Sequence, residues 1–213
     1  LPFLSLWLAA PAIVWWMSQP IARREVVLSS EQVLFLRRMS RKTWDFFEKF
    51  VVAEDNWLPP DNFQESPCSV TAHRTSPTNL GLALLANLSA YDFGYIPLTS
   101  LLTRTENAFL TMSRLERHQG HFYNWYDTQT LQPLPPRYIS AVDSGNLAGH
   151  LLTLRMGLLA VADQPIVSDR LFIGFSDTLS VLADFLPENR PVAFTRLEIL
   201  LTECCARPPM SLV

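Results

Sequence analysis

The sequence predicts an all-α fold, and three observations support this prediction. Apolar residues recur at helical spacing in six segments between residues 29 and 205. Helix start and stop signals flank these segments. No alternating run has the length of a useful strand, apart from short pairings expected within residues 121 to 142. With 48% hydrophobic and 17% charged residues in a chain of 213, the composition excludes a disordered protein and allows a sizeable core.

The first segment is apolar, with no charge before Arg23. It is long enough to cross the hydrocarbon part of a bilayer, and two adjacent tryptophans lie near its end, where an interfacial aromatic belt is expected. We therefore expect residues 1–27 to form the end of a membrane span and a juxtamembrane linker, with the lipid bilayer as a partner. A buried helix divided by prolines is the alternative. Basic residues accumulate between 23 and 42, which predicts that the rest of the chain lies on the cytoplasmic side.

Six helices are then expected in order. Ser29 and Gln32 form the capping-box pattern of the first helix. Ser76 and Pro77 open the second helix, which Gly94 closes. The expected helices run from Ser29 to Val51, from Pro77 to Tyr91, from Pro97 to Leu115, from Gly145 to Val161, from Val167 to Phe185 and from Pro191 to Cys205.

The connections between these helices alternate in length. Long loops follow the first and third helices, whereas the second and fourth helices end in short turns. In a stack of antiparallel helices, every second connection lies at the same end, so both long loops gather on one face. Long loops in compact domains are usually functional. We therefore expect one binding face, toward which the helices beginning at Pro77 and Gly145 point their amino ends.

The side chains of this face suggest a carbohydrate ligand. Aromatic rings stand next to amides and carboxylates, and sugars stack their C–H faces on rings while their hydroxyls need donors and acceptors. Rings that only pack a long loop onto the domain are the alternative. The predicted substrate-binding residues are Trp57, Asp61, Asn62, Thr78, Asn79, Tyr123, Asn124, Trp125, Tyr126, Asp127, Tyr138, Ser144 and Asn146.

Asp143 is the candidate catalytic residue. It ends the aromatic loop at an expected helix start, where the partial positive charge of the helix keeps a carboxylate ionised. We favour the binding of a sugar hydroxyl over catalysis for this side chain, and plain helix capping by Asp143 or Ser144 is the structural alternative. Arg74, just before the earlier helix start, is placed to pair with Asp61 or Asp143 across the cleft.

Other classes of site find little support. The net charge of −3 gives no basic field for a phosphate backbone, which excludes nucleic acid as a partner. The three cysteines have no CxxC spacing and suggest reduced thiols. His118 and His121 are close in sequence but lack a third ligand, so no metal site is expected. No nucleotide-binding motif occurs, and we expect no cofactor in this region.

Two stretches of the sequence resemble those of a known protein family. TSPTNLGLALLANLSAYDFGYIP and TMSRLERHQGHFYNWYDTQTLQPLPPRYISAVDSGNLAGHL closely resemble the start of the central glycoamylase-like domain of cyclic β-1,2-glucan synthases. The upstream WWMSQPIARRE and WDFFEKFVVAEDNWLPPDNFQE resemble the region that joins the membrane part of that family to this domain. The resemblance covers roughly residues 1 to 162 and extends over several motifs in order.

The resemblance implies a place in a large bacterial inner-membrane enzyme. Such synthases combine a glycosyltransferase domain, membrane helices, a central (α/α)6 barrel and a phosphorylase-like domain. The central domain, on the cytoplasmic side, would bind linear β-1,2-glucan and cyclise it by retaining transglycosylation. Residues 28–213 would then be the amino-terminal part of that domain, a partial (α/α)6 barrel with about half of its helical hairpins.

Retaining chemistry limits what this chain does alone. It needs a nucleophile and an acid/base carboxylate about 5 Å apart. From the resemblance we expect this pair to be glutamates beyond Val213, so the fragment would be inactive alone. A non-catalytic glycan-binding helical scaffold and a β-1,2-glucan hydrolase remain the alternatives.

Overall fold

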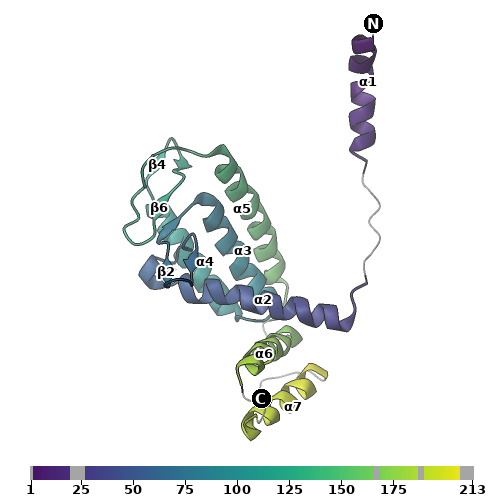
Figure 1. Ribbon diagram of the computed structural model, residues 1–213, viewed down its shortest axis with the longest axis vertical. Coiled ribbons are helices and arrows are strands. Elements are labelled where there is room, and N and C mark those ends of the chain that lie inside the picture. Colours follow the sequence, from purple (N-terminus) through teal and green to yellow (C-terminus); the bar gives the residue numbers. More distant parts are fainter. Residues whose placement is uncertain (1, 20–26, 166–167, 187–189, 207–213) are drawn as a thin grey trace. The chain divides into compact units, whose positions relative to one another are not determined.

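The computed structural model describes residues 2–19, 27–165, 168–186 and 190–206, and it divides into two compact units, residues 1–33 and 34–213. The described part of the chain contains seven α-helices and six strands of two residues each. Figure 1 shows how the chain runs through these elements. The all-α prediction is therefore confirmed. The partial (α/α)6 barrel is not confirmed and stays a prediction.

The first unit contains helix α1, Pro2–Met17, with Pro11 inside it. Its described side chains are exposed, including Trp15 and Trp16. Among the residues that the structure describes, no helix combines the length and the apolar character needed to cross a membrane. The predicted membrane span is thus without structural support, and Arg23, within the predicted linker, lies outside the described residues.

Helix α2, Ser30–Phe50, begins as predicted. The backbone N–H of Ser29 donates to Gln32 Oε1 at 2.9 Å, and the backbone N–H of Gln32 donates to Ser29 Oγ at 3.3 Å. This reciprocal pair is a capping box and confirms the helix start. Farther along α2, Trp44 is its buried side chain.

Three helices form the centre of the second unit: α3 (Pro77–Asp92), α4 (Leu98–Arg114) and α5 (Ala141–Ala162). Helix α3 packs against both α4 and α5, and Figure 1 shows α3 and α5 running side by side. These helices supply most of a core whose largest fully buried aliphatic side chains include Leu84, Leu101 and Leu154.

The turn after α3 requires a glycine. Gly94 has a φ of +78°, a conformation that other residues rarely adopt, and a Cβ at this position would lie 1.9 Å from the carbonyl oxygen of Arg170. On the facing helix, a Cβ on Gly174 would lie 2.3 Å from the oxygen of Gly94. Gly94 therefore closes α3, as predicted, and also lets α6 (Asp169–Leu182) approach the turn backbone to backbone.

Helix α5 begins four residues earlier than predicted, at Ala141 instead of Gly145. Ser140 is the cap, because its Oγ accepts the backbone N–H of Asp143 at 3.1 Å. The later elements are α6 (Asp169–Leu182), the 3₁₀ turn η2 (Ala183–Phe185) and α7 (Val192–Ala206), which match the expected helices to within two residues.

The two long loops are joined by strands. The structure contains β1 (Phe63–Gln64), β2 (Val70–Thr71), β3 (Arg74–Thr75), β4 (Arg117–His118), β5 (His121–Phe122) and β6 (Tyr126–Asp127). Strands β1 and β2 pair with each other, as do β4 and β5, whereas β6 pairs with β3 of the other loop. Short pairings were expected within residues 121 to 142, where the structure has an isolated bridge between Tyr126 and Pro133, while β5 pairs with β4, just before that range. Both long loops therefore meet next to the start of α3.

A buried carboxylate strengthens this junction. Asp55, in the 3₁₀ turn η1 (Ala53–Asp55), is 5% exposed, and its Oδ1 accepts the Thr128 hydroxyl at 2.5 Å. The same oxygen lies 2.7 Å from His73 Nδ1. In addition, the backbone N–H of Thr128 donates to the carbonyl of His73 at 3.0 Å. Asp55 thus ties together three points of the two loops.

Candidate functional site

A polar cluster lies where the paired loops meet the starts of α3 and α5. On the first loop, Arg74 forms an ion pair with Asp61, with 2.9 Å between Nη2 and Oδ2. Asp61 Oδ1 also accepts the side-chain amide of Asn79 at 3.3 Å. The Arg74 guanidinium lies 4.9 Å from the ring centroid of Trp125 on the second loop. Arg74 therefore connects a carboxylate of one loop to an aromatic ring of the other.

Asp143 occupies the first turn of α5 and contacts the first turn of α3. The hydroxyl of Thr78 donates to Asp143 Oδ1 at 2.6 Å, and the Asn146 amide donates to the Thr78 oxygen at 3.1 Å. Burial raises the pKa of Asp143, but hydrogen bonds from Ser140 and Thr78 outweigh it, so the pKa lies below its ordinary value. The carboxylate is consequently ionised at neutral pH.

The amide of Asn124 joins the remaining groups. With its oxygen toward the second loop, it accepts the Tyr138 hydroxyl at 2.6 Å and the Trp125 indole N–H at 2.7 Å. Its nitrogen then donates to Asp143 Oδ2 at 3.0 Å. The opposite orientation would set the amide nitrogen against the indole N–H, two donors without an acceptor.

We call this connected set the loop-junction cluster. Each member is linked to another by one of the contacts above or by the hydrogen bond from Asn62 Nδ2 to Asp61 Oδ2 at 3.2 Å. The members are Asp61, Asn62, Arg74, Thr78, Asn79, Asn124, Trp125, Tyr138, Asp143 and Asn146. All except Arg74 are among the site residues predicted from the sequence, and the expected pairing of Arg74 with Asp61 is present.

Five predicted residues lie outside the cluster: Trp57, Tyr123, Tyr126, Asp127 and Ser144. The Trp57 ring faces Arg104 of α4, with 5.8 Å from the guanidinium carbon to the ring centroid. The Tyr126 side chain is fully buried and its hydroxyl donates to the Glu116 carbonyl at 2.6 Å, so it offers no surface to a ligand. Tyr123 packs edge-on against Tyr126. The side chain of Ser144 makes no contact that joins it to the cluster, and its backbone N–H donates to Ser140.

Asp127 stabilises its own turn. Its Oδ1 accepts the backbone N–H groups of Gln129 and Thr130 at 3.0 and 2.7 Å and the Thr130 hydroxyl at 3.0 Å. Burial raises the pKa of Asp127, but the hydrogen bonds from Thr130 and Gln129 prevail and lower it. This arrangement is an Asx-type turn, which gives Asp127 a structural role and places it outside the cluster.

Sequence reasoning missed the role of Ser140 and the burial of Asp55. Ser140 and Asp143 are three residues apart, which is the spacing of a cap and its partner, so the start of α5 had a local signal. Asp55 had none, because its partners His73 and Thr128 come from distant points of the chain.

No group of three or more potential metal ligands occurs among the described residues. His118 and His121 face each other across β4 and β5, and both are exposed. The cluster itself holds two carboxylates, and one of them, that of Asp61, is neutralised by Arg74. Its chemistry is therefore that of a hydrogen-bonding surface with two aromatic rings, those of Trp125 and Tyr138.

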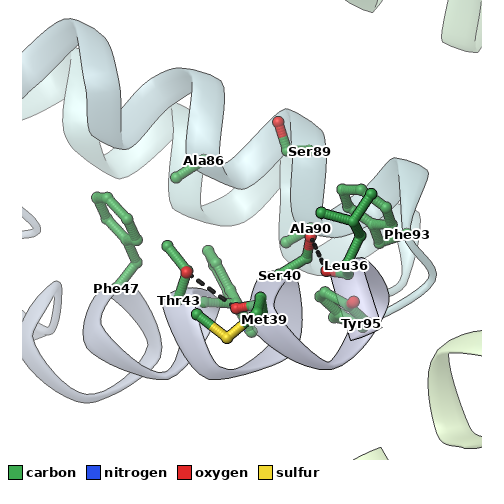
Figure 2. A pocket seen from close by; sticks show the side chains of 11 residues that line it. Leu36, Met39, Ser40, Thr43, Phe47, Ala86, Ser89, Ala90, Phe93 and Tyr95 are labelled. Atoms are coloured by element: carbon green, nitrogen blue, oxygen red, sulfur yellow. Dashed lines mark hydrogen bonds between the residues drawn. The ribbon is translucent and has the colours of Figure 1, made fainter. Parts of the chain in front are cut away.

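Two grooves of the second unit differ in how well they suit a polar ligand. An apolar groove of about 330 Å³ lies between α2 and α3 (Figure 2), where the Ser40 and Thr43 hydroxyls bond to carbonyls of their own helix at 2.9 Å each. The indole N–H of Trp44, which also lines this groove, is itself buried, whereas a sugar needs several accessible donors and acceptors. A second groove, of about 560 Å³, is lined in part by Asp61 and Asn62. The second groove adjoins the cluster and suits a polar ligand better.

No family model matches the chain. It is 44% identical over 190 residues to the cyclic beta-(1,2)-glucan synthase NdvB of Rhizobium meliloti, a match that covers 88% of this chain and 7% of that protein. Among solved structures, a glucoamylase-like protein of Bacteroides fragilis aligns with a TM-score of 0.42 and 15% identity, over 87% of this chain and 37% of the other. That likeness is too weak to support a statement about the fold.

The match in sequence covers most of the chain, including both stretches that form the loop-junction cluster. It also agrees with the resemblance inferred from those stretches. The chain is therefore related, over 88% of its length, to one part of a cyclic β-(1,2)-glucan synthase, and it spans 7% of the length of that protein.

Proposed function

We propose that the loop-junction cluster binds β-1,2-glucan, and that this chain belongs to the part of a cyclic glucan synthase that handles the linear glucan. The relative's name supplies the class of ligand. The observation that carries the proposal is the pairing of β3 with β6, which brings carboxylates, amides and an indole from two loops to one place. That combination suits a sugar, which needs a stacking surface and matched hydrogen bonds.

The geometry suggests how a glucose unit would lie. Arg74 lies over the Trp125 ring at 4.9 Å, so a sugar would stack on the other face of that ring. Hydroxyls of the sugar would donate to the ionised Asp143, which is partly exposed. The exposed amides of Asn62 and Asn146 would supply donors and acceptors at the edges.

For the reaction, we propose that the full-length parent cyclises the glucan by retaining transglycosylation. Asp143 would be a ligand of a sugar hydroxyl in this scheme, because Thr78 and Asn124 hold its two oxygens and its pKa is lowered, which does not suit a general acid. The nucleophile and the acid/base, a carboxylate pair about 5 Å apart, would lie outside the cluster.

The wider setting is part of the same proposal. The resemblance to cyclic glucan synthases suggests a bacterial inner-membrane location with this domain on the cytoplasmic side. It also suggests a glycosyltransferase domain, a phosphorylase-like domain and the lipid bilayer as partners.

The test uses the full-length parent protein, incubated with linear β-1,2-glucan and assayed for cyclic products. Asp143→Asn and Trp125→Ala are expected to abolish or strongly reduce cyclisation. The matched controls are Asp163→Asn, at the exposed end of α5, and Trp57→Ala, whose ring faces Arg104. Unchanged cyclisation in both site variants would remove the cluster from the proposed site.

The same assay separates the alternatives. Linear products of reduced length would identify a hydrolase. Binding without any conversion by the parent would identify a non-catalytic scaffold. Titration of linear β-1,2-glucan against the tryptophan fluorescence of the 213-residue chain measures binding without turnover.

A further inference from the structure

We infer that Asn124 is a positioning residue, whose buried amide holds the Trp125 ring and the Asp143 carboxylate in the orientation that binds glucan. This inference rests on the proposed function. It changes the role predicted for Asn124 from the sequence, where it was expected to bind the substrate itself.

Burial separates Asn124 from any ligand. Asn124 is only 6% exposed, and its backbone N–H donates to the carbonyl of Tyr138 at 2.9 Å. Both the backbone and the side chain are therefore fixed by the protein. A glucan at the surface would contact the groups around Asn124 and not Asn124.

Both the oxygen and the nitrogen of the amide have hydrogen-bond partners. Its oxygen accepts from the Trp125 indole N–H at 2.7 Å and from the Tyr138 hydroxyl at 2.6 Å, which fills both lone pairs. Its nitrogen donates to Asp143 Oδ2 at 3.0 Å. A single planar group thus sets the relative positions of three side chains from the second loop and α5.

Each of these side chains also has a support elsewhere in the cluster. Arg74 lies against the Trp125 ring, and Thr78 donates to the other oxygen of Asp143. Asn124 is the group that contacts both Trp125 and Asp143, so it couples the stacking surface to the hydrogen-bonding carboxylate. Without the Asn124 amide, Trp125 and Asp143 would each keep one supporting contact. Their orientation relative to each other would no longer be fixed.

The first experiment monitors the Trp125 indole directly. In ¹H–¹⁵N spectra of the 213-residue chain, the indole resonance that disappears in Trp125→Phe belongs to Trp125. In Asn124→Ala this resonance is expected to shift and its hydrogen to exchange faster, because the acceptor is gone. The glucan dissociation constant is expected to rise about tenfold or more, as for the loss of hydrogen bonds in a shared network. Asn107→Ala on α4 is the matched control, for which neither change is expected.

A second variant tests the contact with Asp143. Asn124→Asp keeps the size of the side chain but places a second carboxylate against Asp143, and such a pair shares one proton when the pH falls. The titratable or charged groups facing this pair are the Tyr138 phenol and, over Trp125, the Arg74 guanidinium. We expect this variant to bind glucan weakly near pH 8 and to recover affinity toward about pH 5, where the added carboxylate can donate its proton. The wild type and Asn107→Ala are expected to lack this recovery.

The outcomes are distinct. If wild-type protein does not bind glucan, the proposed function fails, while the indole measurement still tests the hydrogen bond from Trp125 to Asn124. The inference is overturned if Asn124→Ala leaves the indole resonance and the affinity unchanged. Should Asn124→Ala unfold, a pH-independent affinity of Asn124→Asp equal to that of the wild type would overturn it instead.

Discussion

Removing the Asp55 carboxylate is expected to destabilise the junction of the two loops by a calculable amount. Asp55→Ala leaves the hydroxyl of Thr128, a residue with no exposed surface, without its acceptor. An unsatisfied buried polar group costs about 1–3 kcal/mol, and the lost hydrogen bond with the half-exposed His73 adds about 1 kcal/mol. We therefore expect the free energy of unfolding to fall by about 3 kcal/mol, which lowers Tm by about 6–12 °C in a chain of this size.

Two further variants calibrate this value. Asp55→Asn keeps an oxygen for Thr128 and is expected to cost only about 1 kcal/mol. Glu54→Ala, an exposed neighbour in the same 3₁₀ turn, is expected to change nothing measurable.

Urea unfolding gives the three free energies, and hydrogen exchange of the Thr128 amide, which is bonded to the His73 carbonyl, reports the junction itself. If Asp55→Ala costs less than about 1 kcal/mol, or no more than Glu54→Ala, the carboxylate does not hold the loops and the reasoning fails.

Three other predictions follow from the fold and the cluster. Gly94→Ala, at φ +78° and with Arg170 O 1.9 Å from the new Cβ, is expected to cost at least about 2 kcal/mol in thermal unfolding; a wild-type Tm would contradict the close approach of α6. Ser140→Ala removes the cap of α5 and is expected to cost about 1 kcal/mol of unfolding free energy, with Ser113→Ala in α4 as a control that costs less. Because the folded-state pKa of Asp143 lies below the ordinary 3.8, its contribution to stability is present above pH 3.8 and is lost as the pH falls through the folded-state value. Acid titrations of unfolding free energy for the wild type and Asp143→Asn should therefore converge at low pH, and parallel curves would contradict the lowered pKa.

Helix starts and ends were largely predictable, because their signals are local. The capping box at Ser29 and Gln32 and the cap at Ser76 depend on residues three apart in sequence, and both are present. The predicted start of α5 was too late in the sequence, because the prediction was based on Asp143 and overlooked the cap at Ser140. The bilayer interpretation of the first segment depended on its hydropathy, its two tryptophans and the basic residues that follow it, and helix α1 is 16 residues long.

The site was predictable in composition but not in contacts. Alternating loop lengths indicated that the two loops share a face, and β3 and β6 do pair. However, strands of two residues have no periodicity to read, so the pairing itself could not be predicted. The same limit explains Tyr126, which looked like a sugar-stacking ring and is fully buried. Burial depends on the fold around a residue, and the sequence near Tyr126 does not reveal it.

The contacts that hold the two loops together affect how a ligand would bind. Strand pairing, the Asp55 carboxylate and the Asn124 amide order the cluster without any help from a ligand. Such preorganisation lowers the entropy lost on association, because side chains are immobilised during folding. A saccharide would thus bind to side chains that are already in place, and we expect little rearrangement of the backbone when it binds.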